Sequence, residues 1–145
     1  MKIYFVRHGQ SEHNEQKRYA GQIDSPLTDL GRKQAHETGL LLQDKDITHI
    51  VSSTLSRAKD TAQMIKDVID PENTIPFENI ASFQEGDFGE IQGQPYTTAQ
   101  GLVAGIESGT GESAQELYDR AKECLKYYEN TTVAISFFEV PKFQS

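Results

Sequence analysis

Short apolar runs alternate with helical patterns along this chain, and this alternation is the feature that most limits the folds open to it. The first run, Ile3–Val6, is continuously apolar, as expected of a parallel strand that is buried on both faces. Later runs rich in β-branched residues favour strands at Ile47–Ser52, Ile75–Phe77 and Thr131–Val140. The alternation of strands with helices predicts an α/β fold, a three-layer α/β/α sandwich around a parallel sheet.

Four segments between these strands show helical patterns. Helices are expected over Thr28–Gln43, Ser56–Val68, Thr97–Glu107 and Ser113–Glu129. The last of them opens with a capping box, in which Ser113 and Glu116 satisfy each other's backbone N–H groups. The inward face of the first helix is expected to carry Leu30, Ala35, Thr38, Leu41 and Leu42.

The size and charge of the chain narrow the classes of partner. A chain of 145 residues is expected to form one domain, residues 1–145. Its formal net charge of −8 argues against a nucleic-acid partner, which requires clustered Lys and Arg, but two well-placed arginines still permit a small phosphorylated one. No apolar run approaches the length of a membrane span. Because Cys124 is the only cysteine, no internal disulfide can form, and we expect a cytoplasmic protein.

Charged side chains follow the first two predicted strands, where ligands of open α/β sheets bind. Arg7 and His8 come directly after the first strand, and Arg57 follows the second. Guanidinium groups match the geometry of phosphate oxygens, and a neutral imidazole is a competent nucleophile towards phosphorus. Two neighbouring cations should also lower the pKa of His8 and keep its lone pair available. The sequence therefore predicts a phosphate site in which His8 accepts a phosphoryl group.

Five blocks of the sequence stand in an order that is specific to one family. They are Val6–Asn14, Tyr19–Gly31, Ser52–Ala62, Phe83–Gly93 and Gly111–Ser113. Together they resemble the histidine phosphatase superfamily, which includes the cofactor-dependent phosphoglycerate mutases. The resemblance covers almost all of residues 1–135 and implies a phosphoglycerate mutase-like sandwich.

The resemblance also implies roles for particular residues. His8 would form a phosphohistidine through Nε2, with the other ring nitrogen held by a backbone carbonyl. Arg7 and Arg57 would hold the phosphoryl oxygens, and Glu85 would act first as general acid and then as general base, with a pKa raised by partial burial. The other residues expected to bind the phosphate are Ser11, Asn14, Gly21 and Gln22. No metal or other cofactor is implied, because the arginines supply the positive charge.

The fourth predicted strand departs from the family pattern. The family carries a second histidine there, in a block similar to V-x-S-H-G, whereas this chain has Phe137 and Phe138 at the last two positions. Resemblance ends at about Ser136, so we expect a C-terminally truncated domain whose sheet lacks the family's last strands. Loss of one hydrogen-bond donor to an oxyanion typically costs about 10²–10³ in rate, so impaired activity is expected.

These features predict hydrolysis of a phosphomonoester, a small phosphorylated metabolite, through a phosphohistidine. A phosphoglycerate mutase is the alternative within the same chemistry. Only 17 residues separate Gly93 from Gly111, and a cap this short would leave the site open to water, which favours hydrolysis. A non-catalytic, phosphate-binding remnant is the alternative from another class, motivated by Phe137.

The expected loss of the last strands bears on assembly. The resemblance places the first strand between the fourth strand and the closing strands of the sheet. Without the closing strands, an apolar strand would lie at an exposed sheet edge, and proteins rarely leave such an edge open. We therefore expect self-association through this edge, by strand addition or domain swapping.

Overall fold

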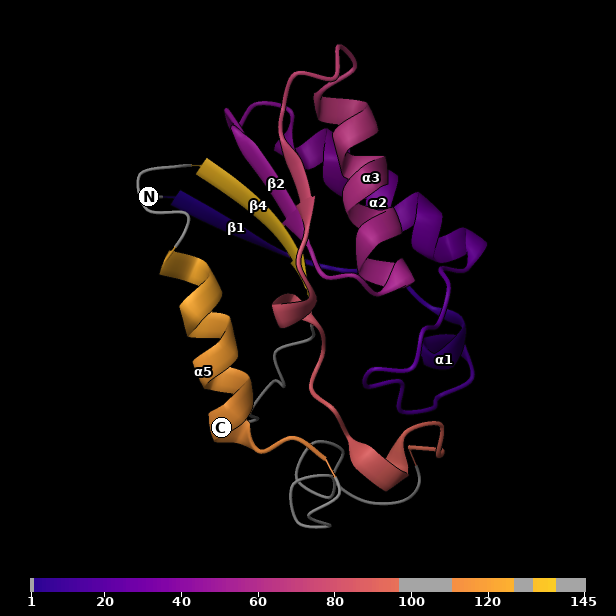
Figure 1. Cartoon of the computed structure of the whole chain (residues 1–145). Coiled ribbons are helices and arrows are strands. Elements are labelled where there is room, and N and C mark those ends of the chain that lie inside the picture. Colours follow the sequence, from indigo (N-terminus) through magenta and orange to yellow (C-terminus); the bar gives the residue numbers. More distant parts are fainter. Residues whose placement is uncertain (1, 97–110, 127–131, 138–145) are drawn as a thin grey trace, which may run out of the picture.

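The computed structural model describes residues 2–96, 111–126 and 132–137 (Figure 1). Its strands are β1 (Lys2–Arg7), β2 (His49–Ser52), β3 (Phe77–Asn79) and β4 (Thr132–Phe137). Its helices are α1 (Glu12–Glu15), α2 (Asp29–Leu42), α3 (Ser56–Ile69) and α5 (Ala114–Leu125), with two short 3₁₀ turns, η1 (Ala81–Phe83) and η2 (Gly89–Ile91). No helix in these ranges is long and apolar enough to cross a membrane.

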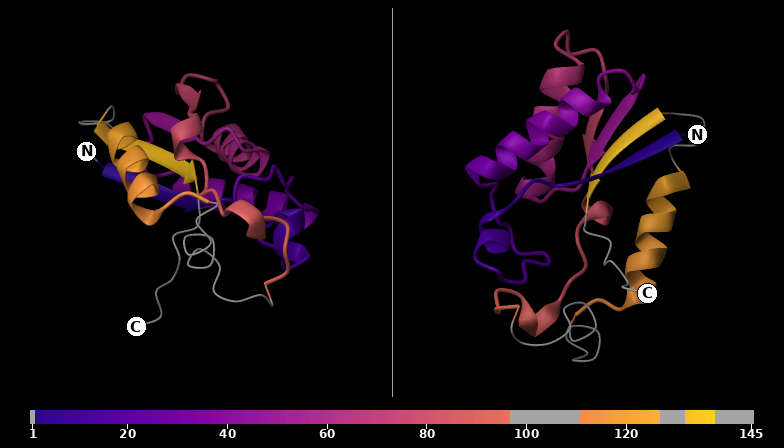
Figure 2. Two further views of the ribbon diagram at one scale, coloured as in Figure 1. Left: turned by 60° about the horizontal axis from the view of Figure 1, so that its bottom comes forward. Right: turned by 180° about the vertical axis from the view of Figure 1, so that it is seen from behind.

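The four described strands form one parallel sheet in the order β1-β4-β2-β3. β4 lies between β1 and β2, with Ala134 in register with Tyr4 on one side and Ile50 on the other. Figures 1 and 2 show α2 and α3 on one side of the sheet and α5 on the other. The arrangement confirms the predicted three-layer α/β fold and places the carboxyl ends of the parallel strands at one edge.

The core lies between the sheet and the two helices α2 and α3. It is built from Val6, Leu42, Ile47, Ile50, Ala62 and Ile65. Helix α3 buries Ala58, Ala62 and Ile65, the face that its apolar spacing predicts. Strand β2 is buried from Ile50 to Ser52, as expected of a central parallel strand covered on both faces.

The inward face of α2 agrees with the prediction in part. Ala35 and Leu42 are buried as expected, and so is Gly39, whereas Leu30 and Leu41 are 49% and 73% exposed. A Cβ on Gly39 would lie 2.9 Å from Cβ of Val68, so α2 packs against α3 through its small residues. Close approach of the two helices therefore decides which face is buried, and Leu30 and Leu41 turn outward.

Other predicted boundaries move for local reasons. β3 begins at Phe77 because Pro76 lacks an N–H and the N–H of Ile75 donates to Asp70, 2.9 Å away. The loop after β1 contains a short helix, α1, that was not predicted. The helix predicted at Thr97–Glu107 lies outside the described residues, as do the ends of the predicted helix and strand beyond α5 and β4.

A buried ionic group stabilises the end of α3. Lys66 Nζ donates to Asp70 Oδ2 at 2.5 Å and to Asn73 Oδ1 at 2.7 Å, and both members of the ion pair are buried. Burial alone would raise the pKa of Asp70, but hydrogen bonds from Lys66, Thr74 and Ile75 outweigh it and hold that pKa well below its usual range. The carboxylate therefore joins α3 to the turn that leads into β3.

We expect Lys66→Ala to lower the melting temperature by roughly 10 °C, because removal of one partner leaves a buried charge uncompensated. Glu123→Gln is the matched control, since it breaks the exposed Lys126–Glu123 pair at the end of α5 and should change the melting temperature little. Thermal unfolding followed by circular dichroism compares the two. An equal effect of both substitutions would mean that the buried pair contributes nothing beyond a surface contact.

Candidate active site

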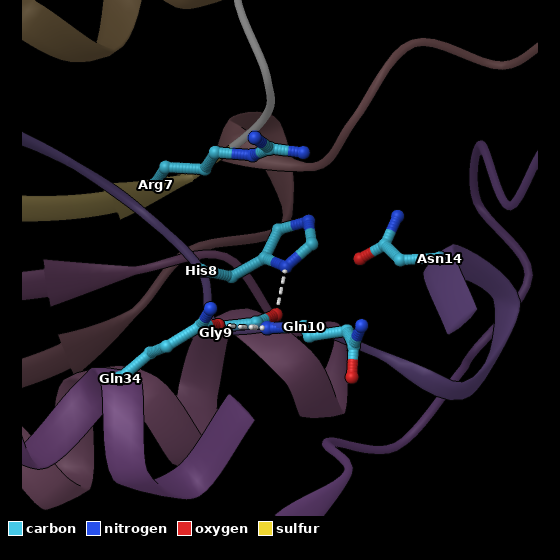
Figure 3. A pocket seen from close by; sticks show the side chains of 6 residues that line it. All are labelled: Arg7, His8, Gly9, Gln10, Asn14 and Gln34. Atoms are coloured by element: carbon cyan, nitrogen blue, oxygen red, sulfur yellow. Dashed lines mark hydrogen bonds between the residues drawn. The ribbon is translucent and has the colours of Figure 1, made fainter. Parts of the chain in front are cut away.

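A cavity of about 370 Å³ opens at the carboxyl end of β1. It is lined by Arg7, His8, Gly9, Gln10, Asn14 and Gln34 (Figure 3). Figure 3 shows the guanidinium of Arg7, the ring of His8 and the amide of Asn14 around one shared space. The cavity thus lies at the sheet edge where the sequence places a ligand.

The orientation of His8 is fixed by its own backbone neighbour. Nδ1 of His8 lies 2.7 Å from the carbonyl oxygen of Gly9 (Figure 3), and because a carbonyl can only accept, Nδ1 carries the proton. Nε2 is therefore the nitrogen with the lone pair. The N–H of Gly9 in turn donates to Thr61 Oγ1 of α3 at 3.0 Å, which fastens the end of β1 to the helix.

His8 is only 8% exposed, and burial lowers its pKa to about 4. The hydrogen bond to Gly9 opposes this shift, while the positive charges of Arg57 and Arg7 add to it. The direction agrees with the sequence-based prediction, but that prediction credited the arginines, and burial has the larger effect. The ring is held neutral at neutral pH.

Arg57, on the first turn of α3, is 2% exposed and is not among the residues that line the cavity. Its guanidinium donates to the carbonyl oxygens of Gly21 at 2.5 Å and Ile23 at 2.8 Å. Burial lowers the pKa of Arg57, and the negative charges of Glu85 and Asp24 oppose that shift. Arg57 therefore carries a charge next to His8 and also fixes the loop that contains Gly21, a residue with φ of +53°.

Of the two expected phosphate ligands Ser11 and Asn14, Asn14 lines the cavity and Ser11 does not. Ser11 is fully buried, does not line the cavity and forms a capping box with Asn14 at the start of α1. The N–H and the hydroxyl of Ser11 both donate to Asn14 Oδ1, each at 3.0 Å. Asn14 consequently has its oxygen occupied, and its Nδ2 has no acceptor among the described residues.

Glu85 is 9% exposed, so the expected burial of this carboxyl is confirmed, but it does not line the cavity. Its Oε1 accepts a hydrogen bond from the N–H of Gly86 at 2.9 Å. The side-chain amide of Gln22 donates to the backbone carbonyl of Glu85 at 3.2 Å. Gln22 therefore connects the loop held by Arg57 to the loop that carries Glu85, and it too lies outside the cavity lining.

Sequence reasoning missed two cavity residues, Gln10 and Gln34. Gln34 Oε1 accepts from the N–H of Gln10 at 2.9 Å, and the side-chain NH₂ groups of both residues have no acceptor within the described part of the chain. Gln10 stands inside the motif around His8 and could have been included. Gln34 carries no such signal, because only the packing of α2 against the end of β1 brings it there.

The end of β4 lies beside the site. Phe137, the last residue of β4, is in register with Arg7 on β1. The backbone at position 137 is thus the neighbour of the residue that leads into His8. Within the described ranges, no group of three or more His, Cys, Asp or Glu side chains could hold a metal ion.

Solved structures with different activities share this fold. A phosphoglycerate mutase from Bacillus anthracis superposes with a TM-score of 0.80 at 20% identity, over 93% of this chain and 73% of that one. A mycobacterial glucosyl-3-phosphoglycerate phosphatase, in complex with VO₃, superposes with a TM-score of 0.77 at 23% identity, over 91% and 72%. At these identities the likeness concerns the fold alone.

Sequence comparison identifies the family. A probable phosphoglycerate mutase from Erwinia tasmaniensis is 32% identical in an alignment 144 positions long that covers 90% of this chain and 66% of that protein. The chain spans 61% to 66% of the length of such relatives. Residues 3–134 match the family model described as "Histidine phosphatase superfamily (branch 1)". This match covers most of the chain and shows that it belongs to branch 1 of the histidine phosphatase superfamily.

Proposed function

We propose that this chain hydrolyses a small phosphomonoester by way of a phosphohistidine at His8. The observation that carries the proposal is the state of the His8 ring, which is buried, neutral and held through Nδ1 so that Nε2 keeps its lone pair. A neutral nitrogen lone pair beside two guanidinium groups suits attack on a phosphoryl group, whose negative oxygens the guanidiniums attract. Because a single cysteine cannot form an internal disulfide, we also propose that the protein is cytoplasmic.

In the proposed first step, Nε2 of His8 attacks phosphorus while the bond from phosphorus to the ester oxygen breaks. Glu85, in its protonated form, gives its proton to the departing oxygen, so the alcohol leaves neutral. Arg7 and Arg57 stabilise the charge that develops on the phosphoryl oxygens. The side-chain NH₂ groups of Gln10, Asn14 and Gln34 supply further hydrogen-bond donors around the cavity.

In the proposed second step, water attacks the phosphohistidine from the side that the alcohol has left. The Glu85 carboxylate takes a proton from this water, the bond between phosphorus and Nε2 breaks, and inorganic phosphate departs. Glu85 is then protonated and His8 neutral, as before the first step. The cycle needs no metal, because the two arginines provide the positive charge.

A phosphoglycerate mutase is the second candidate, since relatives at 32% to 36% identity carry the name probable phosphoglycerate mutase. The two reactions share the first step and differ in whether water or a substrate oxygen takes the phosphoryl group from His8. A phosphate binder without turnover is the third candidate, because the phenyl ring of Phe137 cannot donate a hydrogen bond to an oxyanion.

Trapping of the intermediate tests the nucleophile. We expect ³²P-labelled p-nitrophenyl phosphate to label the protein in a form that survives base and is lost in acid, as expected for a phosphohistidine. His8→Gln should abolish the label, because the amide nitrogen is not nucleophilic, whereas His13→Gln, the matched control in α1, should keep it. Label that persists in His8→Gln would assign the nucleophile elsewhere. A wild-type chain that binds phosphate but takes no label would favour the phosphate binder.

The pH dependence of the His8 ring is a separate prediction. Nuclear magnetic resonance of histidine-labelled protein, assigned with His8→Gln, should show His8 titrating near pH 4 rather than near its ordinary pKa of 6.5. Because the folded state lowers this pKa, the stability that neutral His8 contributes is fully present above pH 6.5 and is lost as the pH falls towards 4. A midpoint near 6.5 would show that the ring is solvated and contradict its burial.

We also propose that the chain associates with itself through β1. In the described sheet β1 is an edge strand, with β4 on its one side, and Phe5 on this strand is 62% exposed. An apolar strand at a sheet edge is a template for addition of another strand.

Light scattering during gel filtration measures the assembly. The expected mass is a multiple of 16.2 kDa, and Phe5→Lys should shift it towards the monomer, because edge lysines oppose strand pairing. Lys122→Gln on α5 is the control, since Lys122 is exposed and packs over the ring of Tyr118. A wild-type chain that elutes as a stable 16.2 kDa monomer would refute self-association.

A further inference from the structure

Arg120 reaches from α5 to the segment that carries Glu85. Helix α5 packs against η1, and the chain runs from η1 towards η2 beside it (Figure 1). The guanidinium of Arg120 donates through Nη1 to the carbonyl oxygen of Ser82 at 2.5 Å and through Nη2 to that of Glu85 at 3.0 Å. One side chain thus holds the backbone on both sides of Gln84.

Glu112, just before α5, binds both Arg120 and the segment that Arg120 holds. Its two carboxylate oxygens accept from Nε and Nη2 of Arg120 at 2.5 Å and 2.9 Å, in a bidentate pair. Glu112 Oε2 also accepts from the N–H of Asp87 at 3.3 Å, and the N–H of Glu112 donates to the Asp87 carbonyl at 2.7 Å. The pair therefore touches the segment at residues 82, 85 and 87.

The backbone beside Glu112 lies very close to the backbone of Asp87. A Cβ on Gly111 would lie 2.3 Å from the carbonyl oxygen of Asp87, so a larger residue at 111 would push the two segments apart. The side chains of Arg120 and Glu112 are 21% and 15% exposed, which shields their ion pair from much of the screening that weakens surface pairs.

The segment held in this way has no regular structure between η1 and η2. Its position depends on side chains from two distant parts of the chain, because Gln22 donates to the same Glu85 carbonyl that accepts from Arg120. Its backbone carbonyl is fixed between these two donors, and Oε1 of its carboxyl accepts from the N–H of Gly86 at 2.9 Å, so both the backbone and the carboxyl of Glu85 have defined places.

We propose that Arg120 and Glu112 are a positioning pair that holds the segment 82–87 so that the Glu85 carboxyl can protonate the leaving oxygen. The inference rests on the proposed function, which gives Glu85 its role as general acid. Neither residue touches the substrate. Their effect on the reaction passes through the place of Glu85.

Leaving groups of different basicity test this role. Labelling rates of His8 are measured with p-nitrophenyl phosphate, whose leaving group needs little protonation, and with an alkyl phosphate, whose leaving group needs a proton. Glu85→Gln, Arg120→Lys and Glu112→Gln should each lose at least about tenfold more rate on the alkyl ester than on the aryl ester. Lys122→Gln, on the same helix, should leave the ratio of the two rates unchanged.

Hydrogen exchange supplies a readout that does not depend on turnover. Exchange at the Gly86 and Asp87 amides should rise at least about tenfold in Arg120→Lys and Glu112→Gln, with exchange in β2 unchanged. Equal loss of rate on both esters, or unchanged exchange at these amides, would overturn the positioning role. If the wild-type chain takes no label from either ester, the proposed function fails, and the exchange measurement alone then supports or overturns the hold on residues 82–87.

Discussion

The close approach of the backbone after β1 to the start of α2 is the constraint on which the site depends. A Cβ on Gly9 would lie 2.2 Å from the carbonyl oxygen of Gly31, and a Cβ on Gly31 would lie 2.1 Å from that of Gln10. These two glycines thus let the backbone after β1 contact the first turn of α2. Thr61 of α3 accepts from the N–H of Gly9 at the same place. The ring of His8 is held by this junction, because Nδ1 donates to the Gly9 carbonyl.

The burial of His8 and Arg57 also sets the charges of these two side chains. His8 is useful as a nucleophile only when it is neutral, and burial beside two cations keeps it so. Arg57 is itself buried, and the negative charges of Glu85 and Asp24 compensate for the loss of water around it. The proposed nucleophile and cation therefore depend on one another, because the charge of Arg57 helps to keep His8 neutral while the charge of Glu85 helps to keep Arg57 protonated.

Sequence reasoning succeeded where one local pattern fixes the outcome. The apolar run before Arg7 predicted a strand, and the structure has β1 there. The spacing of Ala58, Ala62 and Ile65 predicted the buried face of a helix, and α3 buries these residues. It failed in part for α2, where Ala35 and Leu42 are buried as expected but the close packing of Gly39 against Val68 leaves Leu30 and Leu41 exposed. Gln34 and Arg120 escaped notice for a related reason, since their partners at Gln10 and Glu85 are distant in sequence and only the tertiary structure unites them.

The two sides of the proposed reaction are built differently. The nucleophile side uses residues 7–14, a continuous stretch fixed by the end of β1 and the cap of α1. The acid side is assembled from separate loops, held by Gln22, Glu112 and Arg120. At position 137, in register with Arg7, the phenylalanine side chain has no hydrogen bond to give. In the proposed reaction, stabilisation of the phosphoryl oxygens therefore rests on the two arginines and on the side-chain amide donors around the cavity.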